Sequence, residues 1–142
     1  MRVPRIVIDT HVFLSALRSR RGASFKLLSL VGGRQFQISV SVPLVLEYEE
    51  AAKGHLRDTA LTRGDIDDIL DYVCRVANHH EISYLWRPFL RDPKDDFILE
   101  LAVEAGCDTI VTYNKRDFAG AERFGVQVLT PREFLQKRGL LS

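Results

Sequence analysis

The sequence predicts an α/β protein with a mostly parallel central sheet. Short apolar runs, the first of them Ile6-Val7-Ile8, alternate along the chain with longer segments that show helical spacing. The clearest helical spacing is that of Ile66, Ile69, Leu70, Val73, Cys74 and Ala77, which recur at three and four residues. Alternating strands and helices are typical of parallel sheets, because parallel strands need long crossover connections.

The first half of the chain is expected to contain two strands and three helices. Gly32-Gly33 follows a helical segment and is a strong terminator. Ser41 suits the cap of the third helix, and Pro43 suits its first turn. The expected elements are a strand at 5–9, helices at 11–18 and 23–31, a strand at 35–40 and a helix from 43 to about 53.

The second half continues the alternation. Thr62 or Asp65 caps the next helix, and Gly106 ends a helix that starts at Asp95-Asp96. Thr130-Pro131 opens the last helix. The expected elements are a helix to residue 77, a short strand near 81–84, a loop at 85–93, a helix at 95–105, a strand at 109–112, a turn or a short helix at 115–118, a strand at 127–129 and a helix at 131–137.

Composition sets the bounds for this chain. Its 142 residues fit a single domain over 1–142, and a content of 46% hydrophobic and 27% charged residues is ordinary for a globular protein. The chain contains no apolar stretch near the roughly 20 residues of a spanning helix and no signal-peptide core, so a cytoplasmic protein without a membrane partner is expected. Cys74 and Cys107 have no metal-binding spacing and are expected to be reduced packing residues.

Acidic residues recur at the edges of the predicted elements. Asp9 ends the first strand, Glu47 falls on the apolar face of the third helix, and Asp95-Asp96 and Asp117 follow later strands. In open α/β sheets, ligands bind beyond the carboxyl ends of the strands. Carboxylates that converge there repel one another unless a cation joins them, and hard oxygen ligands suit Mg²⁺ or Mn²⁺. The pattern therefore predicts divalent-metal chemistry on a phosphodiester.

Each acid also has an ordinary structural interpretation. Asp95 or Asp96 could be a helix cap, and Asp117 could cap a turn. Glu47 could lie on a frayed helix, and Asp9 could make a structural hydrogen bond. Only the joint arrangement of these acids favours a site.

In this order and spacing, the motifs resemble a PIN-domain ribonuclease of the kind that serves as the toxin of bacterial and archaeal toxin–antitoxin pairs. The resemblance covers nearly the whole chain. It rests on the segments Val7–Thr10, Phe13–Leu17, Ser41–Tyr48 and Arg91–Asp96, on Ala102 and Gly106, and on Val111–Phe118. It implies a three-layer α/β/α sandwich with about five parallel strands, an Mg²⁺- or Mn²⁺-dependent endoribonuclease, a homodimer and an antitoxin partner.

The resemblance also implies roles for individual residues. The family's acids fall on Asp9, on Glu47, on Asp96 with Asp95 as the rival, and on Asp117 or the position of Asn114. Thr10, His11, Thr112 and Asn114 take supporting positions. Two residues depart from the family pattern, because His11 stands where Asn is frequent and Asn114 stands where many members have Asp.

Basic and aromatic residues are candidates for contacts with RNA. Phosphate contacts supply affinity without sequence information. Trp86 and Tyr84 could stack on an unpaired base or serve in the core or a dimer. The phosphate candidates are Arg20, Arg21, Arg91, Lys115 and Arg116, with Arg18 and Arg87 as further ones.

Two other functions compete with the nuclease. A non-catalytic PIN-like module that binds RNA or a protein partner would explain His11 and Asn114. A phosphotransfer domain built on Asp9 is disfavoured, because one such class of enzyme wants a second Asp where His11 stands.

Overall fold

The computed structural model describes residues 3–81 and 90–141 and contains a five-stranded sheet in which every pairing is parallel. The strand order is β3-β2-β1-β4-β5, so the first strand is central and its neighbours are the second and the fourth. Ile6 pairs with Ile38 on one side and with Thr109 on the other. The strands are β1 (Arg5–Ile8), β2 (Gln37–Val40), β3 (Asn78–His79), β4 (Thr109–Val111) and β5 (Gln127–Leu129).

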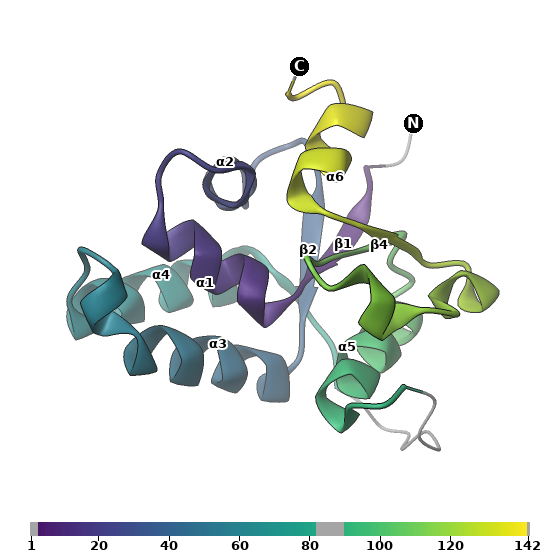
Figure 1. Cartoon of the computed structure of the whole chain (residues 1–142), viewed down its shortest axis with the longest axis horizontal. Helices are drawn as coiled ribbons and strands as arrows, with labels where there is room; N and C mark the ends of the chain where they lie inside the picture. The colour runs from purple at the N-terminus through teal and green to yellow at the C-terminus, as the bar shows by residue number, and fades with distance from the viewer. Residues whose placement is uncertain (1–2, 82–89, 142) are drawn as a thin grey trace.

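Helices cover both faces of this sheet, as Figure 1 shows. The first four helices lie on one face, where α1 packs on α2 and α3, and α3 packs on α4. The fifth crosses the other face against β1, β2 and β4, and the sixth packs on α2 and β5. The three-layer α/β/α prediction is therefore confirmed. The helices are α1 (Thr10–Arg18), α2 (Ala23–Ser29), α3 (Val42–Gly54), α4 (Arg63–Val76), α5 (Pro93–Glu104) and α6 (Pro131–Lys137), with the short 3₁₀ turns η1 (Leu56–Asp58), η2 (Lys115–Phe118) and η3 (Ala121–Phe124).

The central strand explains why the core forms between these layers. Ile6 and Val7 are fully buried and Ile8 nearly so, although successive side chains of a strand point to opposite faces. A strand that is apolar on both sides requires cover on both, which α1 and α5 help to supply. The short apolar run at the start of the sequence thus forms the middle of the sheet.

Capping residues set most helix starts as the sequence predicts. The Ser41 hydroxyl accepts a hydrogen bond from the Leu44 N–H, and Thr62 and Asp65, the two rival caps, form one reciprocal capping box. The start of α5 is different from the prediction, because the cap is Asp92, whose carboxylate accepts the Lys94 N–H at 2.9 Å. Asp95 and Asp96 therefore lie in the first helical turn and are not the cap.

The third strand also departs from its predicted position. It lies at Asn78–His79, paired with Ser39 and Val40, and Glu81 lies outside it. The physical reason is that α4 ends at Val76, so the chain enters the sheet directly after the helix. The rest of the predicted strand and most of the predicted loop, residues 82–89, lie outside the described residues.

Within residues 3–81 and 90–141, no helix has both the length and the apolar character needed to cross a membrane. Cys74 and Cys107 are free cysteines, and Cys107 is buried.

Candidate active site

Four of the predicted carboxylates, from four separate parts of the chain, line one cavity of about 450 Å³ at the carboxyl edge of the sheet. Asp9 follows β1, Glu47 lies in the second turn of α3, Asp95 in the first turn of α5, and Asp117 in η2. The cavity lies where β1 and β4 are neighbours, although the chain leaves these two strands in different directions. Such a switch point is where open α/β sheets bind their ligands.

The carboxylate of Asp9 is fixed by the neighbouring strand. Its Oδ2 accepts a hydrogen bond of 2.7 Å from the Thr112 hydroxyl. The Thr112 hydroxyl oxygen in turn accepts a hydrogen bond of 3.0 Å from the Asn114 N–H. Although Asp9 stands at the N-cap of α1, its side chain makes no capping hydrogen bond. Burial raises the pKa of Asp9, and the Thr112 hydrogen bond opposes part of that rise. This acid is therefore held toward the cavity at an energetic cost that capping does not offset.

The carboxylate of Glu47 is positioned by contacts between α1 and α3. The Thr10 hydroxyl donates to Glu47 Oε2 at 3.1 Å. The next residue, Tyr48, stacks on Phe13 with ring centroids 4.5 Å apart, and its hydroxyl donates to the Ile8 carbonyl. These contacts anchor α3 to the end of β1. Burial raises the pKa of Glu47, while the Thr10 hydrogen bond and the charge of Lys94 lower it.

The structure separates the two adjacent acids of α5. Asp95 lines the cavity, whereas Asp96 is 6% exposed, does not line it, and accepts the Leu90 N–H at 2.8 Å. The pKa of Asp95 rises to about 7, first because of burial and then because of the negative charges of Asp9, Asp92 and Asp117, with Asp96 adding to them. Asp95, which the sequence indicated as the rival of Asp96, is thus the acid that faces the other carboxylates.

The remaining predicted site residues complete the rim. His11 and Asn114 line the cavity and are exposed, as is Asp117. His11 lies close enough for its charge to lower the pKa of Asp9, against the rise caused by burial. Thr10 lines the cavity as well, whereas Thr112 is fully buried beneath it.

Several lining residues were not among the predicted site residues. Lys94 lies beside the acids in the first turn of α5, and Asp92 caps that helix. Glu50 and His55 extend the cavity along α3 and just beyond its end. Glu50 could have been found from its spacing, because it lies three residues after Glu47 on the same helix. Lys94 could have been found once the helix start was placed at Asp92.

Most of the predicted phosphate contacts do not lie at this cavity. Arg20 and Arg21 line a separate hollow beyond the far end of α1. Lys115 donates to both oxygens of Glu133, at 3.0 and 3.2 Å. The other predicted contacts in the described residues, Arg91 and Arg116, are exposed and do not line the cavity, and Arg18 forms an ion pair of 3.4 Å with Asp58. Tyr84, Trp86 and Arg87 lie outside the described residues.

The donor types fit a hard divalent cation, because carboxylate oxygens suit Mg²⁺ and Mn²⁺. Besides burial, the negative charges of neighbouring acids raise the pKa of Asp95. A bound cation would offset those charges. As the side chains stand, no three Asp, Glu, His or Cys residues in the described ranges form a ready metal cluster. An ion would therefore be held with small side-chain adjustments or through water, which Mg²⁺ commonly retains.

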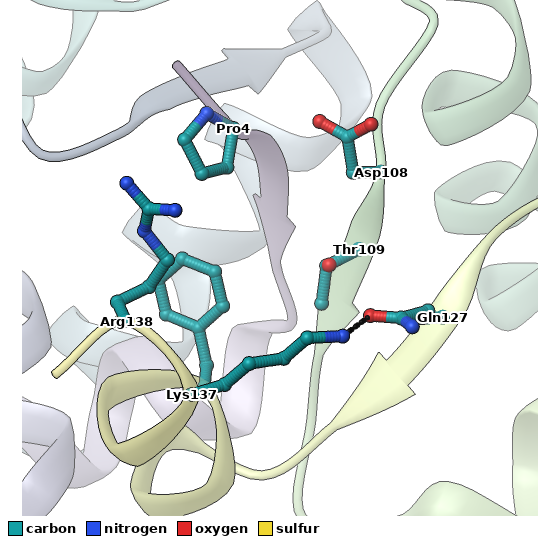
Figure 2. A pocket seen from close by; sticks show the side chains of 7 residues that line it. Pro4, Asp108, Thr109, Gln127, Lys137 and Arg138 are labelled. Carbon is teal, nitrogen blue, oxygen red and sulfur yellow. Dashed lines mark hydrogen bonds between the residues drawn. The ribbon is translucent and has the colours of Figure 1, made fainter. Parts of the chain in front are cut away.

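A second cavity, of about 330 Å³, lies at the opposite edge of the sheet (Figure 2). Pro4, Asp108 and Gln127 stand near the starts of β1, β4 and β5, and Lys137 donates to Gln127 at 2.7 Å. Its one carboxylate, that of Asp108, accepts the Arg5 N–H at 3.0 Å. This cavity has no group of acids, so the residues that could hold a divalent ion lie at the other edge.

Replacing Thr112 with Val is expected to lower the free energy of unfolding by about 1–3 kcal/mol, because the Asp9 carboxylate and the Asn114 N–H both lose a buried partner. Thr112→Ser keeps the hydroxyl and should cost clearly less. Urea unfolding of the three proteins measures the difference. A loss for Ser that equals or exceeds the loss for Val would mean that the methyl group, which Val keeps and Ser lacks, matters at least as much as the hydrogen bonds.

Comparisons with known proteins agree with this geometry. No curated protein matches the chain closely enough to count as a relative. A family profile described as the PIN domain matches residues 5–116, which include Asp9, Glu47 and Asp95 but not Asp117. PIN domains are generally nucleases and typically use divalent metal ions. Since the match spans well over half of the sequence and the fold agrees with it, the chain belongs to the PIN-domain family.

Proposed function

We propose that this chain is an Mg²⁺- or Mn²⁺-dependent endoribonuclease that hydrolyses phosphodiester bonds. The observation that carries the proposal is the convergence of Asp9, Glu47, Asp95 and Asp117 on one cavity at the carboxyl edge of the sheet. Gathering like charges at one cavity opposes folding, so such an arrangement favours the binding of a cation. Membership of a nuclease family gives the reaction class.

Each side chain would have a separable task. Asp9 and Glu47, held by Thr112 and Thr10, would provide fixed oxygen ligands, and Asp95 and Asp117 would complete the set. A bound divalent ion supplies Lewis-acid activation of water and neutralises charge on the phosphoryl group. The hydrolysis would add water to phosphorus, break the bond to the leaving ribose oxygen and transfer a proton from the water to that oxygen.

Lys94 would offset the charge of the substrate. It lines the same cavity as the acids, and its charge lowers the pKa of Glu47. A phosphodiester that approaches an acidic cavity is repelled unless cations stand beside it. We therefore add Lys94 to the predicted phosphate contacts, as the one among the described residues that faces the acids.

The direct test is cleavage of a labelled RNA by the purified chain with Mn²⁺ and with a chelator. Metal-dependent endonucleolytic cleavage supports the proposal. A labelled single-stranded DNA of the same sequence belongs in the same assay, because cutting of DNA alone would overturn the assignment to RNA.

The charge on Asp95 predicts how the stability of the metal-free chain depends on pH. Its pKa is about 7 in the folded chain and near 3.8 in the unfolded chain. Its contribution to the stability of the fold is therefore fully present below pH 3.8 and is lost as the pH rises through about 7. Without divalent ions, Tm should therefore rise as the pH falls from above 7 to about 5. Millimolar Mn²⁺ should raise Tm above pH 7 by binding the folded state.

Asp95→Asn is expected to flatten this pH dependence, whereas Asp68→Asn, an exposed acid of α4, should leave it unchanged. Differential scanning fluorimetry across the pH range makes the comparison. A Tm that is insensitive to both pH and Mn²⁺ would argue against a charged metal site.

The second candidate function is a catalytically weak PIN-like module that binds RNA or a protein. It is favoured by His11 and Asn114, which depart from the family pattern and both line the cavity. Calorimetric titration with Mn²⁺ separates the two functions, because heat of binding at millimolar Mn²⁺ favours the enzyme and its absence favours the module.

We also propose that the chain is the toxin of a toxin–antitoxin pair and forms a homodimer. Exposed apolar side chains beside the acidic cavity support a protein partner, since contiguous apolar surface often marks an interface. Val42 is 69% and Leu46 56% exposed on α3, and Phe97 lies on the neighbouring helix α5. Light scattering tests the dimer, and inhibition of cleavage by the product of an adjacent small gene tests the antitoxin. A monomer that no such product inhibits would argue against both.

A further inference from the structure

The separate hollow that Arg20 and Arg21 line has a volume of about 400 Å³ and lies between the start of α2 and residues 140–141. Its lining carries four positive charges and no negative one. The cations are Arg20, Arg21, Lys26 and Arg132. The ring of Phe25 lies among them and is 36% exposed. The full lining is Arg20, Arg21, Gly22, Ala23, Phe25, Lys26, Ser29, Arg132, Leu140 and Leu141. We refer to this hollow as the cationic pocket.

These four charges are not neutralised within the described part of the chain. The ion pairs there involve Arg18, Lys53 and Lys115, and none includes a cation of the cationic pocket. Like charges gathered without counterions repel one another, so the chain bears a cost unless an anion shares the surface. The whole chain has nearly balanced charge, with 20 Lys and Arg against 19 Asp and Glu, so a hollow lined by four cations and no acid departs locally from that balance.

Two contacts connect the cationic pocket with the acidic cavity. The hydroxyls of Tyr113 and Ser24 share a hydrogen bond, and these residues precede Asn114 of the cavity and Phe25 of the pocket. The ammonium of Lys115 donates to Glu133, the neighbour of Arg132 in α6. The two sites thus adjoin through the segment that follows β4.

The separation between the sites suits an extended strand. Thr10 and His11 at the start of α1 line the acidic cavity, and Arg20 follows the end of the same helix. With a rise of 1.5 Å per residue, that helix is about 13 Å long. A few nucleotides of an extended strand span such a distance. Tyr113, 46% exposed, lies on this route, and a base can stack on an exposed aromatic ring.

We propose that the cationic pocket binds backbone phosphates of the RNA strand whose scissile bond lies at the acidic cavity, with Tyr113 as a stacking platform between them. The inference rests on the proposed function, because it takes RNA as the substrate. It assigns Arg20 and Arg21 a role at a distance from the reacting bond and adds Lys26 and Arg132, which come from separate helices. An acidic protein segment is the other polyanion that could fit these charges.

The test is equilibrium binding of a fluorescein-labelled single-stranded RNA, measured by anisotropy in a chelator and over a series of KCl concentrations. Arg21→Ala/Arg132→Ala should bind at least about tenfold more weakly than the wild type at low salt. The slope of log affinity against log salt should fall by about 1.4, since each phosphate contact to a single strand contributes about 0.7. The matched control is Arg63→Ala/Arg75→Ala, which removes two exposed cations of α4 and should leave both quantities unchanged.

Tyr113 is tested by a pair of variants. Tyr113→Phe loses the hydrogen bond to Ser24 but keeps the ring, and should retain the affinity for RNA. Tyr113→Ala should lose at least about fivefold. Equal losses in both variants would assign Tyr113 a structural role and overturn its part as a platform.

The outcomes separate this inference from the proposed function. If the wild type cleaves RNA but the cationic-pocket and control variants bind it equally, the inference is wrong and the proposed function stands. If the wild type neither binds nor cleaves RNA, both are wrong. If polyglutamate binds the wild type in place of RNA and the Arg21→Ala/Arg132→Ala variant binds neither, the pocket is a docking site for an acidic protein segment.

Discussion

Replacing Asp9 with Asn is expected to abolish metal-dependent RNA cleavage while the chain stays folded. The substitution removes a charge from the acid that the sheet holds through Thr112 at the acidic cavity. A metal ion contributes several kcal/mol of charge stabilisation in the transition state. Since each 1.36 kcal/mol is tenfold in rate, the loss should be about a thousandfold or more.

The fold should tolerate this change well. Burial raises the pKa of Asp9, so a neutral amide removes an unfavourable buried charge, and its carbonyl oxygen can still accept from Thr112. We expect the Tm of the metal-free variant to equal or exceed that of the wild type above pH 7. Cleavage by Asp68→Asn should match the wild type, and normal cleavage by Asp9→Asn would end the proposal for this site.

The adjacent acids of α5 are expected to respond in opposite ways to alanine. Asp95→Ala removes a carboxylate that faces the other acids, so cleavage should fall at least about a hundredfold while the metal-free chain becomes more stable above pH 7. Asp96→Ala removes the acceptor of the buried Leu90 N–H, so the free energy of unfolding should fall by about 1–3 kcal/mol.

Cleavage assays and urea unfolding on both variants give this crossed comparison. Under conditions in which both variants are folded, Asp96→Ala should retain more cleavage activity than Asp95→Ala. The reverse pattern, with inactive but stable Asp96→Ala and active Asp95→Ala, would return the ligand role to Asp96, where the family resemblance first placed it.

The parts of this protein that sequence patterns predicted well are those that depend on local chemistry. Ile6-Val7-Ile8 is apolar without alternation, which marks a strand covered on both faces, and it is the central strand. The capping residues Ser41, Thr62 and Thr130 begin helices where expected, because their hydroxyls accept from the first turn. The pairing of β1 with β4 agrees with the general topology of such sheets, and it brings Asp9 and Asp117 to one edge.

The features that the sequence did not predict depend on the exact residue at which a helix begins or on the length of an element. Asp95 and Asp96 differ by about 100° around the helix axis, so the position of the Asp92 cap decides which of them faces the cavity. The third strand is only two residues long, too short for a period-2 pattern to indicate it.

The positions of the basic residues could not follow from the sequence either. Arg20 and Arg21 were predicted to contact RNA phosphates, but α1 carries the chain away from the edge that bears the acids before they occur. Arg132 comes from a helix more than a hundred residues later and meets them only through the packing of α6 on α2. Local patterns give the charge of such residues but not their neighbours.

The hydrogen bond from the Asp9 N–H to the Val111 carbonyl, 3.0 Å long, extends the ladder between β1 and β4 by one rung. The backbone of Asp9 is therefore tied into the sheet, whereas Asp95 and Asp117 are carried by a helix and a short turn outside it. If a divalent ion binds at this cavity, Asp9 would be the ligand whose backbone the sheet fixes. The distances from the ion to the other two acids would then depend on where a helix and a turn begin.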